Sequence, residues 1–263
     1  MSPEVSVLMS VYNGEKYLME AVQSVLRQTF SDFEFIIIDD ASVDSSSQIL
    51  TDFAKLDQRF KIITNKKNLG LTKSLNIGLK NCQGKYVARL DADDVCEPER
   101  LEKQFYFMKN NQAVVLCGTQ GFYLDEKSNK IGQKNLPTNY QEIKSKLLFN
   151  NQFIHSSLFF KKEMVEREGL YNEYFQTSQD YELILRLACK YPVANLSERL
   201  VGWRVGKNSL SWTSKKQEWD AIRARYWAIS KYGYAKIQGI LNMVLRLVYL
   251  LLPQSLKRQR YEN

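Results

Sequence analysis

Histidine and cysteine are scarce in this chain. Its 263 residues include one histidine, His155, and four cysteines: Cys82, Cys96, Cys117 and Cys189. The cysteines are scattered, and no two of them have the spacing of a zinc-binding pair. A zinc site is therefore not expected, and the simplest expectation is reduced thiols in a cytoplasmic compartment.

Export signals and membrane-spanning runs are also lacking. Residues 1–4 are mostly polar and the apolar run after them is short, so no signal peptide is expected. The most apolar stretch, Ile237–Leu252, has 16 residues. As a helix it would span about 24 Å, less than the roughly 30 Å hydrocarbon core of a bilayer. Its polar residues Gln238, Asn242 and Arg246 are spaced by four and form one narrow stripe. We predict a helix that lies in a membrane interface or against a partner; the alternative is a cover for an exposed patch of its own domain.

Positive charge is concentrated in the last quarter of the chain. Residues 1–198 hold 24 Lys and Arg against 26 Asp and Glu, whereas residues 199–263 hold 13 against 3. A near-neutral body with a basic appendage suits an anionic membrane or another polyanion. Aromatic residues there do not alternate with basic ones as in a groove for single-stranded nucleic acid. We therefore predict contact with a membrane surface, where Lys257, Arg258 and Arg260 meet anionic headgroups, and no nucleic acid.

Apolar strands alternate with amphipathic helices through the first hundred residues. Strands are predicted at 5–9, 33–38, 62–64 and 86–90, which favours an α/β fold with a mostly parallel sheet and helices on both faces. Neither a Gly-x-Gly-x-x-Gly fingerprint nor a P-loop is present, so a dinucleotide or ATPase function has no support. Further strands are predicted at 114–117, 153–160 and 200–205, a helix from Asp180, and C-terminal amphipathic helices whose stripe Trp219, Ile222, Tyr226 and Ile229 packs on the body.

The segment 84–101 contains the densest group of chemically useful side chains. A buried strand is followed directly by Asp91, Asp93 and Asp94. Carboxylates crowded at the end of a strand repel one another, and a divalent cation relieves that repulsion. Oxygen-only ligands suit Mg²⁺ or Mn²⁺, and this edge of an open α/β sheet is where ligands bind. A simple polar turn is the alternative.

Several segments, taken in order, resemble the family 2 glycosyltransferases of bacterial polysaccharide and cell-surface glycan synthesis. Any one of them would be a weak signal, but the ordered set covers about four-fifths of the chain. The resemblance implies the GT-A (Rossmann-like) fold, in which a nucleotide-binding half is fused to an acceptor-binding half. The segments are 5–14, 28–30, 38–44 (Ile-Asp-Asp-Ala-Ser-Val-Asp), 68–71, 76–78, 90–94 (Leu-Asp-Ala-Asp-Asp), 155–157 (His-Ser-Ser) and 179–183 (Gln-Asp-Tyr-Glu-Leu).

The resemblance also suggests a donor site. It places the backbone near Ser10 with Tyr12 and Asp40 around a nucleotide base, and it gives the ribose and a metal ion to Asp91 and Asp93. A base can stack on Tyr12, although a core aromatic is as plausible from the residue alone. Asp40 can accept a hydrogen bond from a pyrimidine N–H or cap the next helix, a role that Asp44 could equally take. Asp94 is an additional candidate that could simply face solvent.

On the acceptor side the resemblance makes Asp180 the general base, which removes the proton of the attacking hydroxyl. A first-turn position favours its ionised form. His155 could contact a phosphate or acceptor, or be an ordinary core histidine. Arg204 and Lys207 could close over the diphosphate or belong to the basic tail. One base, one metal and no carboxylate nucleophile fit a single displacement with inversion.

Three positions depart from the family pattern. Gln179 stands where Glu is more common, which removes any helper role for a second carboxylate. Ala41 replaces a common Gly, so its turn is not expected to need a positive φ. Gly206 replaces a histidine or another polar residue, which puts the role of that loop in doubt.

The sequence therefore predicts a GT-A domain over 1–213, divided into a nucleotide-binding half (1–95) and an acceptor-side half (96–213), and a basic helical region over 214–263. The expected enzyme is a Mn²⁺- or Mg²⁺-dependent, inverting hexosyltransferase with a UDP- or dTDP-sugar donor. Its acceptor would be a glycan or lipid-linked glycan at the inner face of the cytoplasmic membrane, and its oligomeric state is open. The rivals are a non-catalytic binding module and a sugar-phosphate nucleotidyltransferase, which would carry a Gly-rich, Arg-containing loop where 11–15 reads Val-Tyr-Asn-Gly-Glu.

Overall fold

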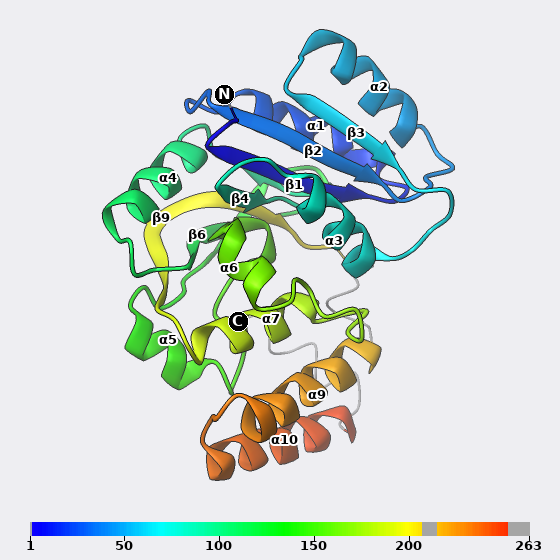
Figure 1. Ribbon diagram of the computed structural model, residues 1–263. Helices are drawn as coiled ribbons and strands as arrows, with labels where there is room; N and C mark the ends of the chain where they lie inside the picture. The colour runs from blue at the N-terminus through cyan, green and yellow to red at the C-terminus, as the bar shows by residue number, and fades with distance from the viewer. Residues whose placement is uncertain (1, 207–214, 252–263) are drawn as a thin grey trace.

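A computed structural model describes residues 2–206 and 215–251. Within them, nine strands form one curled sheet in the order β3-β2-β1-β4-β8-β6-β9-β5, with β7 paired to β6 (Figure 1). The first four strands are parallel, as predicted. They are β1 (Val5–Val11), β2 (Phe33–Asp39), β3 (Phe60–Thr64) and β4 (Tyr86–Arg89).

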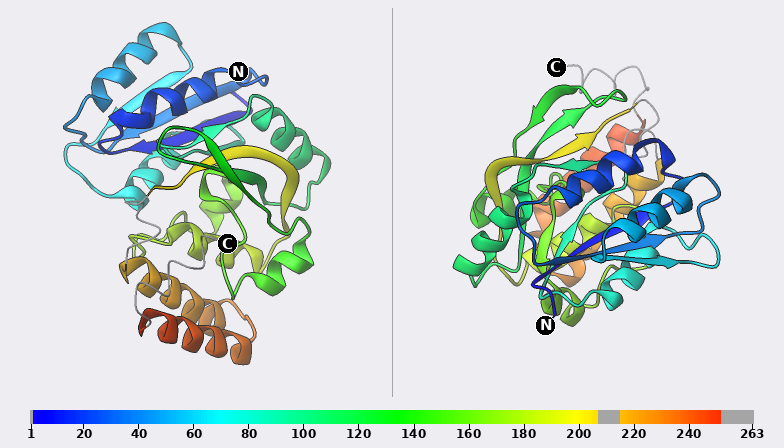
Figure 2. Two further views of the ribbon diagram at one scale, coloured as in Figure 1. Left: turned by 180° about the vertical axis from the view of Figure 1, so that it is seen from behind. Right: turned by 90° about the horizontal axis from the view of Figure 1, so that it is seen from above.

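Apolar side chains on alternate faces of these strands form two buried layers, one on each side of the sheet. Successive side chains of a strand point to opposite faces; Val7 and Met9 of β1 join one buried cluster, whereas Leu8 joins the other. The first cluster is covered by α1 (Glu15–Leu26), α2 (Ser46–Leu56) and α4 (Arg100–Asn110). The second is covered by α3 (Leu71–Asn81), and Figure 2 shows the helices on the two faces.

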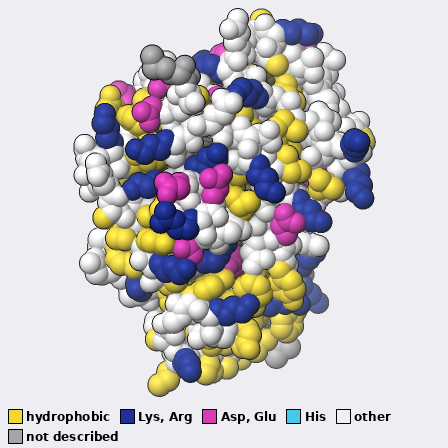
Figure 3. Space-filling model, in the orientation of Figure 1, with side chains coloured by type: hydrophobic (Ala, Val, Ile, Leu, Met, Phe, Trp, Pro, Cys, Tyr) yellow, Lys and Arg dark blue, Asp and Glu magenta, His cyan; other side chains and the backbone are white. Residues whose placement is uncertain are grey.

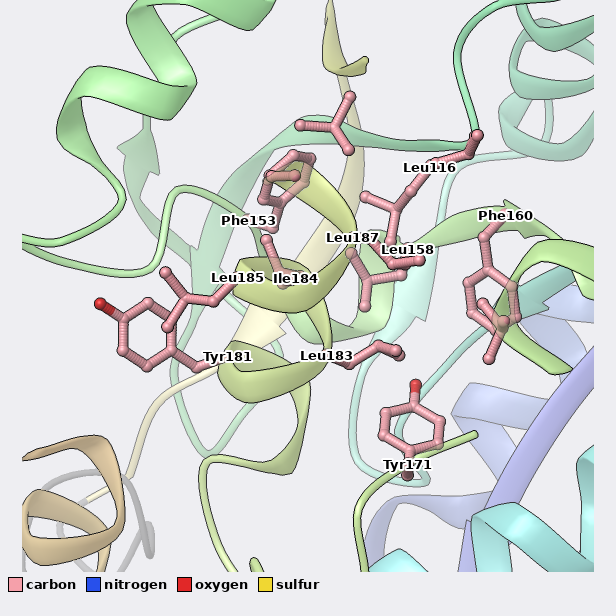
Figure 4. Close-up of a cluster of buried hydrophobic side chains, with 14 of the residues drawn as sticks. Leu116, Phe153, Leu158, Phe160, Tyr171, Tyr181, Leu183, Ile184, Leu185 and Leu187 are labelled. Atoms are coloured by element: carbon pink, nitrogen blue, oxygen red, sulfur yellow. The ribbon is translucent and has the colours of Figure 1, made fainter. Parts of the chain in front are cut away.

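The second half of the chain extends the sheet through antiparallel pairs of β8 with β4 and with β6. Its strands are β5 (Val95–Cys96), β6 (Leu116–Leu124), β7 (Lys130–Lys134), β8 (Phe159–Lys161) and β9 (Val193–Arg204). Its helices are α5 (Tyr140–Lys146), α6 (Lys162–Arg167) and α7 (Gln179–Ala188). The side chains of α7 pack among Leu116, Phe153, Leu158 and Phe160 (Figure 4). This burial fixes the helix that begins next to Asp180.

The predicted strand 153–160 is wrong over most of its length. His155–Ser157 form a 3-10 turn, η1, and only the end of the segment pairs in β8. The serines explain the difference, because Ser157 Oγ donates to the carbonyl of Ile154 at 2.8 Å, and such local bonds compete with a strand ladder. Strands β6 and β9 in turn run further than the predicted 114–117 and 200–205.

The C-terminal helices are α9 (Lys215–Lys231) and α10 (Lys236–Leu251). Packing of the predicted stripe on the body is only partly correct, since Trp219 and Tyr226 are 49% and 55% exposed. The face that α9 buries instead carries Ala224 and Ala228, whose small side chains allow close packing. None of the described helices has the length and apolar character needed to cross a bilayer.

Candidate active site

The candidate site lies at the carboxyl edge of the parallel strands. Strands β2 and β4 flank β1 on opposite sides, so the strand order reverses there. At such a reversal the loops after the strands diverge and leave a crevice for ligands. The segments after β1, β2 and β4 meet this edge, and the β4–β8 pairing brings η1 next to the end of β4.

Two of the three carboxylates after β4 contact one hydroxyl group. Ser156 Oγ lies 2.7 Å from Asp91 Oδ2 and also contacts Asp94 Oδ2, and the Asp91 N–H donates to it at 3.1 Å. A serine hydroxyl has only one proton to donate. One of the two carboxyl groups must therefore supply its own proton to the contact. Asp94 suits that role because it is 2% exposed.

Burial and mutual repulsion separate the acidities of these groups. Burial and the negative charges of Asp93 and Asp91 raise the pKa of Asp94 well above its usual value. Restricted solvation and the charge of Asp91 raise the pKa of Asp93 to about 6, although the side chain of Asp93 is exposed. Burial opposes ionisation of Asp91 too, but Arg89, His155 and the Ser156 hydrogen bond outweigh it and lower its pKa. The cluster therefore favours a cation that removes the repulsion.

A buried arginine lies directly behind the cluster. Arg89 is fully buried; it contacts Asp91 and the carbonyl of Leu90, and its Nε is one of two buried side-chain polar atoms in the described residues that lack a hydrogen-bond partner. Arg100, equally buried, donates to the carbonyl of Arg89 at 2.7 Å. Arg89 places positive charge beside Asp91, and Arg100 supports the backbone that carries Arg89.

Arg204 supports the same loop from the other side. Its backbone N–H donates to Asp94 at 2.8 Å and its Nε to the carbonyl of Asp93 at 2.8 Å. Its two terminal nitrogen atoms bond to Glu20 and to the turn 125–128, and its side chain is 3% exposed. The observed contacts make Arg204 a support for the acidic loop; binding of a diphosphate stays a prediction. Lys207 lies outside the described residues.

Asp40 is buried and holds the loop before α3. One oxygen accepts from Asn65 Nδ2 at 2.7 Å and the Leu69 N–H at 2.8 Å, and the other from the Gly70 N–H at 2.8 Å. Its contact with a base stays a prediction. Tyr12 is 52% exposed at the same edge, which leaves its ring open to stacking. Ser10, near the end of β1, is half-buried.

The turn after β2 corrects one expectation. Ala41 has φ 62°, so this turn does use the left-handed region although glycine is missing. The neighbouring carboxylate compensates, since Asp39 accepts from the Ser42 N–H at 2.9 Å and from the hydroxyl of Ser47. Asp44 accepts from the Ser46 N–H at 2.9 Å. Of the two predicted caps, Asp44 therefore bonds the start of α2.

Asp180 lies in the first turn of α7. Its Oδ2 accepts from Asn151 Nδ2 at 2.8 Å. His155 links it to the acidic cluster: Nδ1 lies 3.6 Å from Asp91 Oδ2 and Nε2 lies 3.3 Å from Tyr171 Oη. Burial and Arg89 lower the pKa of His155, while the charges of Asp91 and Asp180 act in the opposite direction. The charges of the predicted base and of one predicted metal ligand therefore both act on this imidazole.

The donor set fits a metal ion that shares its coordination with a substrate. In the described part of the chain, no group of three or more His, Cys, Asp or Glu side chains can hold a metal by itself. Magnesium sites commonly use one or two carboxylates and complete their shell with water and substrate phosphates. Asp91 and Asp93 meet that requirement.

A cavity of about 660 Å³ between α4 and the start of β9, lined by Glu99, Tyr106 and Asn195 among others, contains none of the predicted residues.

Three residues of the site were not assigned from the sequence. Ser156 was visible only as the middle of the His-Ser-Ser segment. Arg89 appeared as part of an apolar strand, and the carboxylate two residues later is the signal that pairs them. Asn151 has no local signal, because only the tertiary fold brings it to Asp180.

An open α/β sheet with clustered carboxylates at its strand-order reversal is typical of enzymes that bind nucleotides with a metal ion. The family model described as glycosyl transferase family 2 matches residues 6–169, more than half of the chain. The chain is 34% identical to the amylovoran biosynthesis glycosyltransferase AmsE of Erwinia amylovora over 98% of both chains. It is 36% identical to the O-antigen biosynthesis glycosyltransferase WbnJ of Escherichia coli, over 78% of this chain and 81% of WbnJ. The chain belongs to glycosyltransferase family 2.

Solved structures confirm the fold. A structure of S. aureus TarS 1-349 in complex with UDP-GlcNAc superposes with a TM-score of 0.73 over 94% of this chain and 72% of that one, at 17% identity. The mannosyltransferase PcManGT from Pyrobaculum calidifontis, in complex with GDP-Man and Mn²⁺, superposes with a TM-score of 0.69 over 98% of this chain and 72% of that one, at 16% identity. The predicted GT-A architecture is thereby confirmed, and the family establishes a glycosyltransferase.

Proposed function

We propose that this protein is an inverting hexosyltransferase that moves a sugar from a UDP- or dTDP-sugar to a hydroxyl group of a glycan or lipid-linked glycan. The observation that carries this proposal is the position of His155, whose Nδ1 lies 3.6 Å from Asp91 Oδ2 and whose pKa the charge of Asp180 also acts to raise. Asp91 and Asp180 both act on His155, one from the end of β4 and the other from the start of α7. A donor and an acceptor held between them would meet there.

On the donor side, the chain offers a stacking surface and a cation site. The exposed ring of Tyr12 supports a nucleotide base, and Asp91 and Asp93 would hold the ribose and a Mn²⁺ or Mg²⁺ ion. When bound, the ion would neutralise charge on the departing diphosphate. Arg89, Arg204 and Ser156 keep the carboxylates in position before the donor arrives.

On the acceptor side, Asp180 is the proposed general base. The acceptor oxygen forms a bond to the anomeric carbon as the bond from that carbon to the diphosphate oxygen breaks, and the hydroxyl proton passes to the Asp180 carboxylate. Asn151 holds one carboxylate oxygen at 2.8 Å. No step uses a carboxylate as nucleophile, so a single displacement inverts the anomeric configuration. A lipid-linked acceptor would place the reaction at the inner face of the cytoplasmic membrane.

A thermal-shift panel tests the donor site. The protein is heated with UDP, dTDP, GDP or CDP, each with and without Mn²⁺. A ligand at 100 times its Kd should add about 2.7 kcal/mol, roughly a 5–10 °C rise in Tm for a chain of this size. We expect stabilisation by a uridine or thymidine diphosphate only with metal, and its loss in Asp93→Ala. A flat panel contradicts the donor site and favours a non-catalytic module.

The reaction itself is tested with the donor that the panel selects. NMR of the product should show an anomeric configuration opposite to that of the donor sugar. Retention would contradict the single displacement even if transfer occurs.

A further inference from the structure

The outermost helix, α10, carries its apolar side chains on the outside. Seven of its aliphatic residues are more than a third exposed, from 39% for Leu247 to 86% for Ile237. They are Ile237, Ile240, Leu241, Val244, Leu245, Leu247 and Val248, and we call them the apolar arc. Figure 3 shows hydrophobic side chains gathered at the end of the molecule where Figure 1 places α9 and α10.

The polar stripe of α10 faces the protein instead. Asn242 is 4% exposed, and Gln238 and Arg246 donate to backbone carbonyl groups in the segment 145–149 at 3.2 and 3.3 Å. Arg246 also pairs with Glu218 of α9 at 3.5 Å. A surface helix of a water-soluble domain normally has the opposite arrangement, with its apolar stripe against the core. The inverted orientation leaves the apolar arc available to a non-aqueous surrounding.

The net positive charge of α9 and α10 favours an anionic surface as the partner of the apolar arc. From Lys215 to Val248 there are seven Lys and Arg against two Asp and Glu, and α10 contains no acidic residue. The two acidic residues are already paired, Glu218 with Arg246 and Asp220 with Arg223. The exposed cations are Lys215, Lys216, Arg223, Lys231 and Lys236.

Exposed aromatic residues lie on α9 and in the segment that α10 contacts. Phe149 is 48% exposed, and its carbonyl accepts a hydrogen bond from Arg246 of α10. Trp219 and Tyr226, seven residues apart on α9, are 49% and 55% exposed. Large aromatic and basic residues beside an apolar helix face are typical of helices that lie in the headgroup region of a bilayer.

We propose that the apolar arc is a membrane-docking surface. In this arrangement α10 lies parallel to the plane of an anionic bilayer, and the arc enters the boundary between headgroups and acyl chains. Lys215 and Lys236 then contact acidic headgroups. This surface goes beyond the proposed transfer reaction. It rests on the orientation of α10 and on charge, not on the carboxylates of the crevice.

Vesicle flotation tests the docking surface. The full chain is mixed with vesicles of phosphatidylcholine alone, or of phosphatidylcholine with phosphatidylglycerol. We expect flotation with the mixed vesicles only. The double variant Leu241→Glu/Leu245→Glu changes two half-exposed positions and should lower the partition coefficient at least about tenfold. The matched control is Leu56→Glu on α2, where Leu56 is 82% exposed, and it should float like the wild type.

The electrostatic part has its own variant. Lys215→Gln and Lys236→Gln should each weaken partitioning about fivefold, since a basic residue near an anionic surface contributes about that factor. Added salt should weaken it as well.

Three results would overturn the proposal: no flotation of the wild type with either vesicle, undiminished flotation of the double variant, or a lipid-independent dimer that the double variant dissociates while neither protein floats. The last result would assign the arc to a second copy of the chain. Thermal stabilisation by nucleotide and Mn²⁺ is measured on the same double variant. Its retention separates a failed docking surface from a failed donor site.

Discussion

The acidic cluster after β4 and the carboxylate at the start of α7 have contrasting surroundings. Asp91 and Asp94 both contact Ser156, and burial with repulsion among the three carboxylates raises the pKa of Asp93 and Asp94. Asp180 lies in the first turn of a helix and accepts a hydrogen bond from an asparagine amide. We propose that these carboxyl groups have different tasks: the cluster holds a cation, and Asp180 accepts a proton.

The largest effect is expected from a substitution that changes only the carboxylate at the start of α7. Asp180→Asn keeps the shape and an oxygen for Asn151 but cannot accept the hydroxyl proton. We expect kcat to fall about 10²–10⁴-fold, with the nucleotide- and Mn²⁺-dependent rise in Tm unchanged. Glu173→Gln, at an exposed carboxylate before α7, serves as the control. A loss of less than tenfold in Asp180→Asn would reject it as the base.

Ser156→Ala changes only the acidic cluster after β4. Without the hydroxyl, Asp91 and Asp94 lose their shared partner, so Mn²⁺ affinity should fall about 10–100-fold. Titration of the metal into the protein with UDP present measures this change. Ser157→Ala removes an equally buried hydroxyl that bonds to the backbone of Ile154 and Thr119. It should cost stability but not metal affinity, and equal losses of affinity in both variants would contradict the assigned role.

The pH dependence of stability sharpens the contrast. The pKa of Asp93 in the folded protein is raised to about 6. The protonated carboxyl group therefore contributes its full stabilisation at a pH below the pKa of Asp93 in the unfolded chain. This stabilisation is lost as the pH rises through about 6. Because Asp93 is exposed, we expect a discounted loss of about 1 kcal/mol between acidic and neutral pH in EDTA.

Thermal denaturation across this pH range measures the loss. Added Mn²⁺ should restore the stability at neutral pH, and Asp93→Asn should flatten the profile. Glu163→Gln, at an exposed carboxylate on α6, should leave the profile unchanged. A profile that is the same in Asp93→Asn and the wild type would show that another group is responsible.

The smallest effect is expected at the partner of Asp180. Asn151→Ala removes the hydrogen bond that orients the carboxylate, which contributes about 1 kcal/mol, so kcat should fall about fivefold at unchanged KM for the donor. Asn150→Ala changes the adjacent exposed residue and should leave kcat intact. If both variants lose the same activity, the loop 150–151 acts through its backbone and the pair has no special role.

Local patterns were sufficient to predict the parallel half of the fold. Alternation of apolar strands with amphipathic helices identified β1 to β4, and the carboxylates after Leu90 indicated the ligand-binding edge. Local sequence patterns gave a wrong secondary structure where a side chain forms hydrogen bonds to residues distant in the sequence. The apolar segment 153–160 resembles a strand, yet its serines bond to a carboxylate and to the backbone.

The candidate site was predictable as a set of residue types but not as a network. Asp180 was placed through its motif, whereas Asn151 comes to it only by tertiary packing. The orientation of α10 is a similar case: the spacing of Gln238, Asn242 and Arg246 predicts a polar stripe, but no pattern tells whether that stripe faces water or protein. Tertiary hydrogen bonds decide, and here the stripe faces the protein.

Asp220 of α9, 1% exposed, accepts both the N–H and the hydroxyl of Thr177, three residues before Asp180. A recombination event that exchanged everything after residue 213 between two such genes would separate this carboxylate from its partner and disturb the start of α7. A crossover at 233–235 would exchange α10 and the residues after it and would leave Asp220 with its partner. The proposed reaction and the proposed membrane-docking surface could thus be inherited separately, but only by exchange from that turn onward.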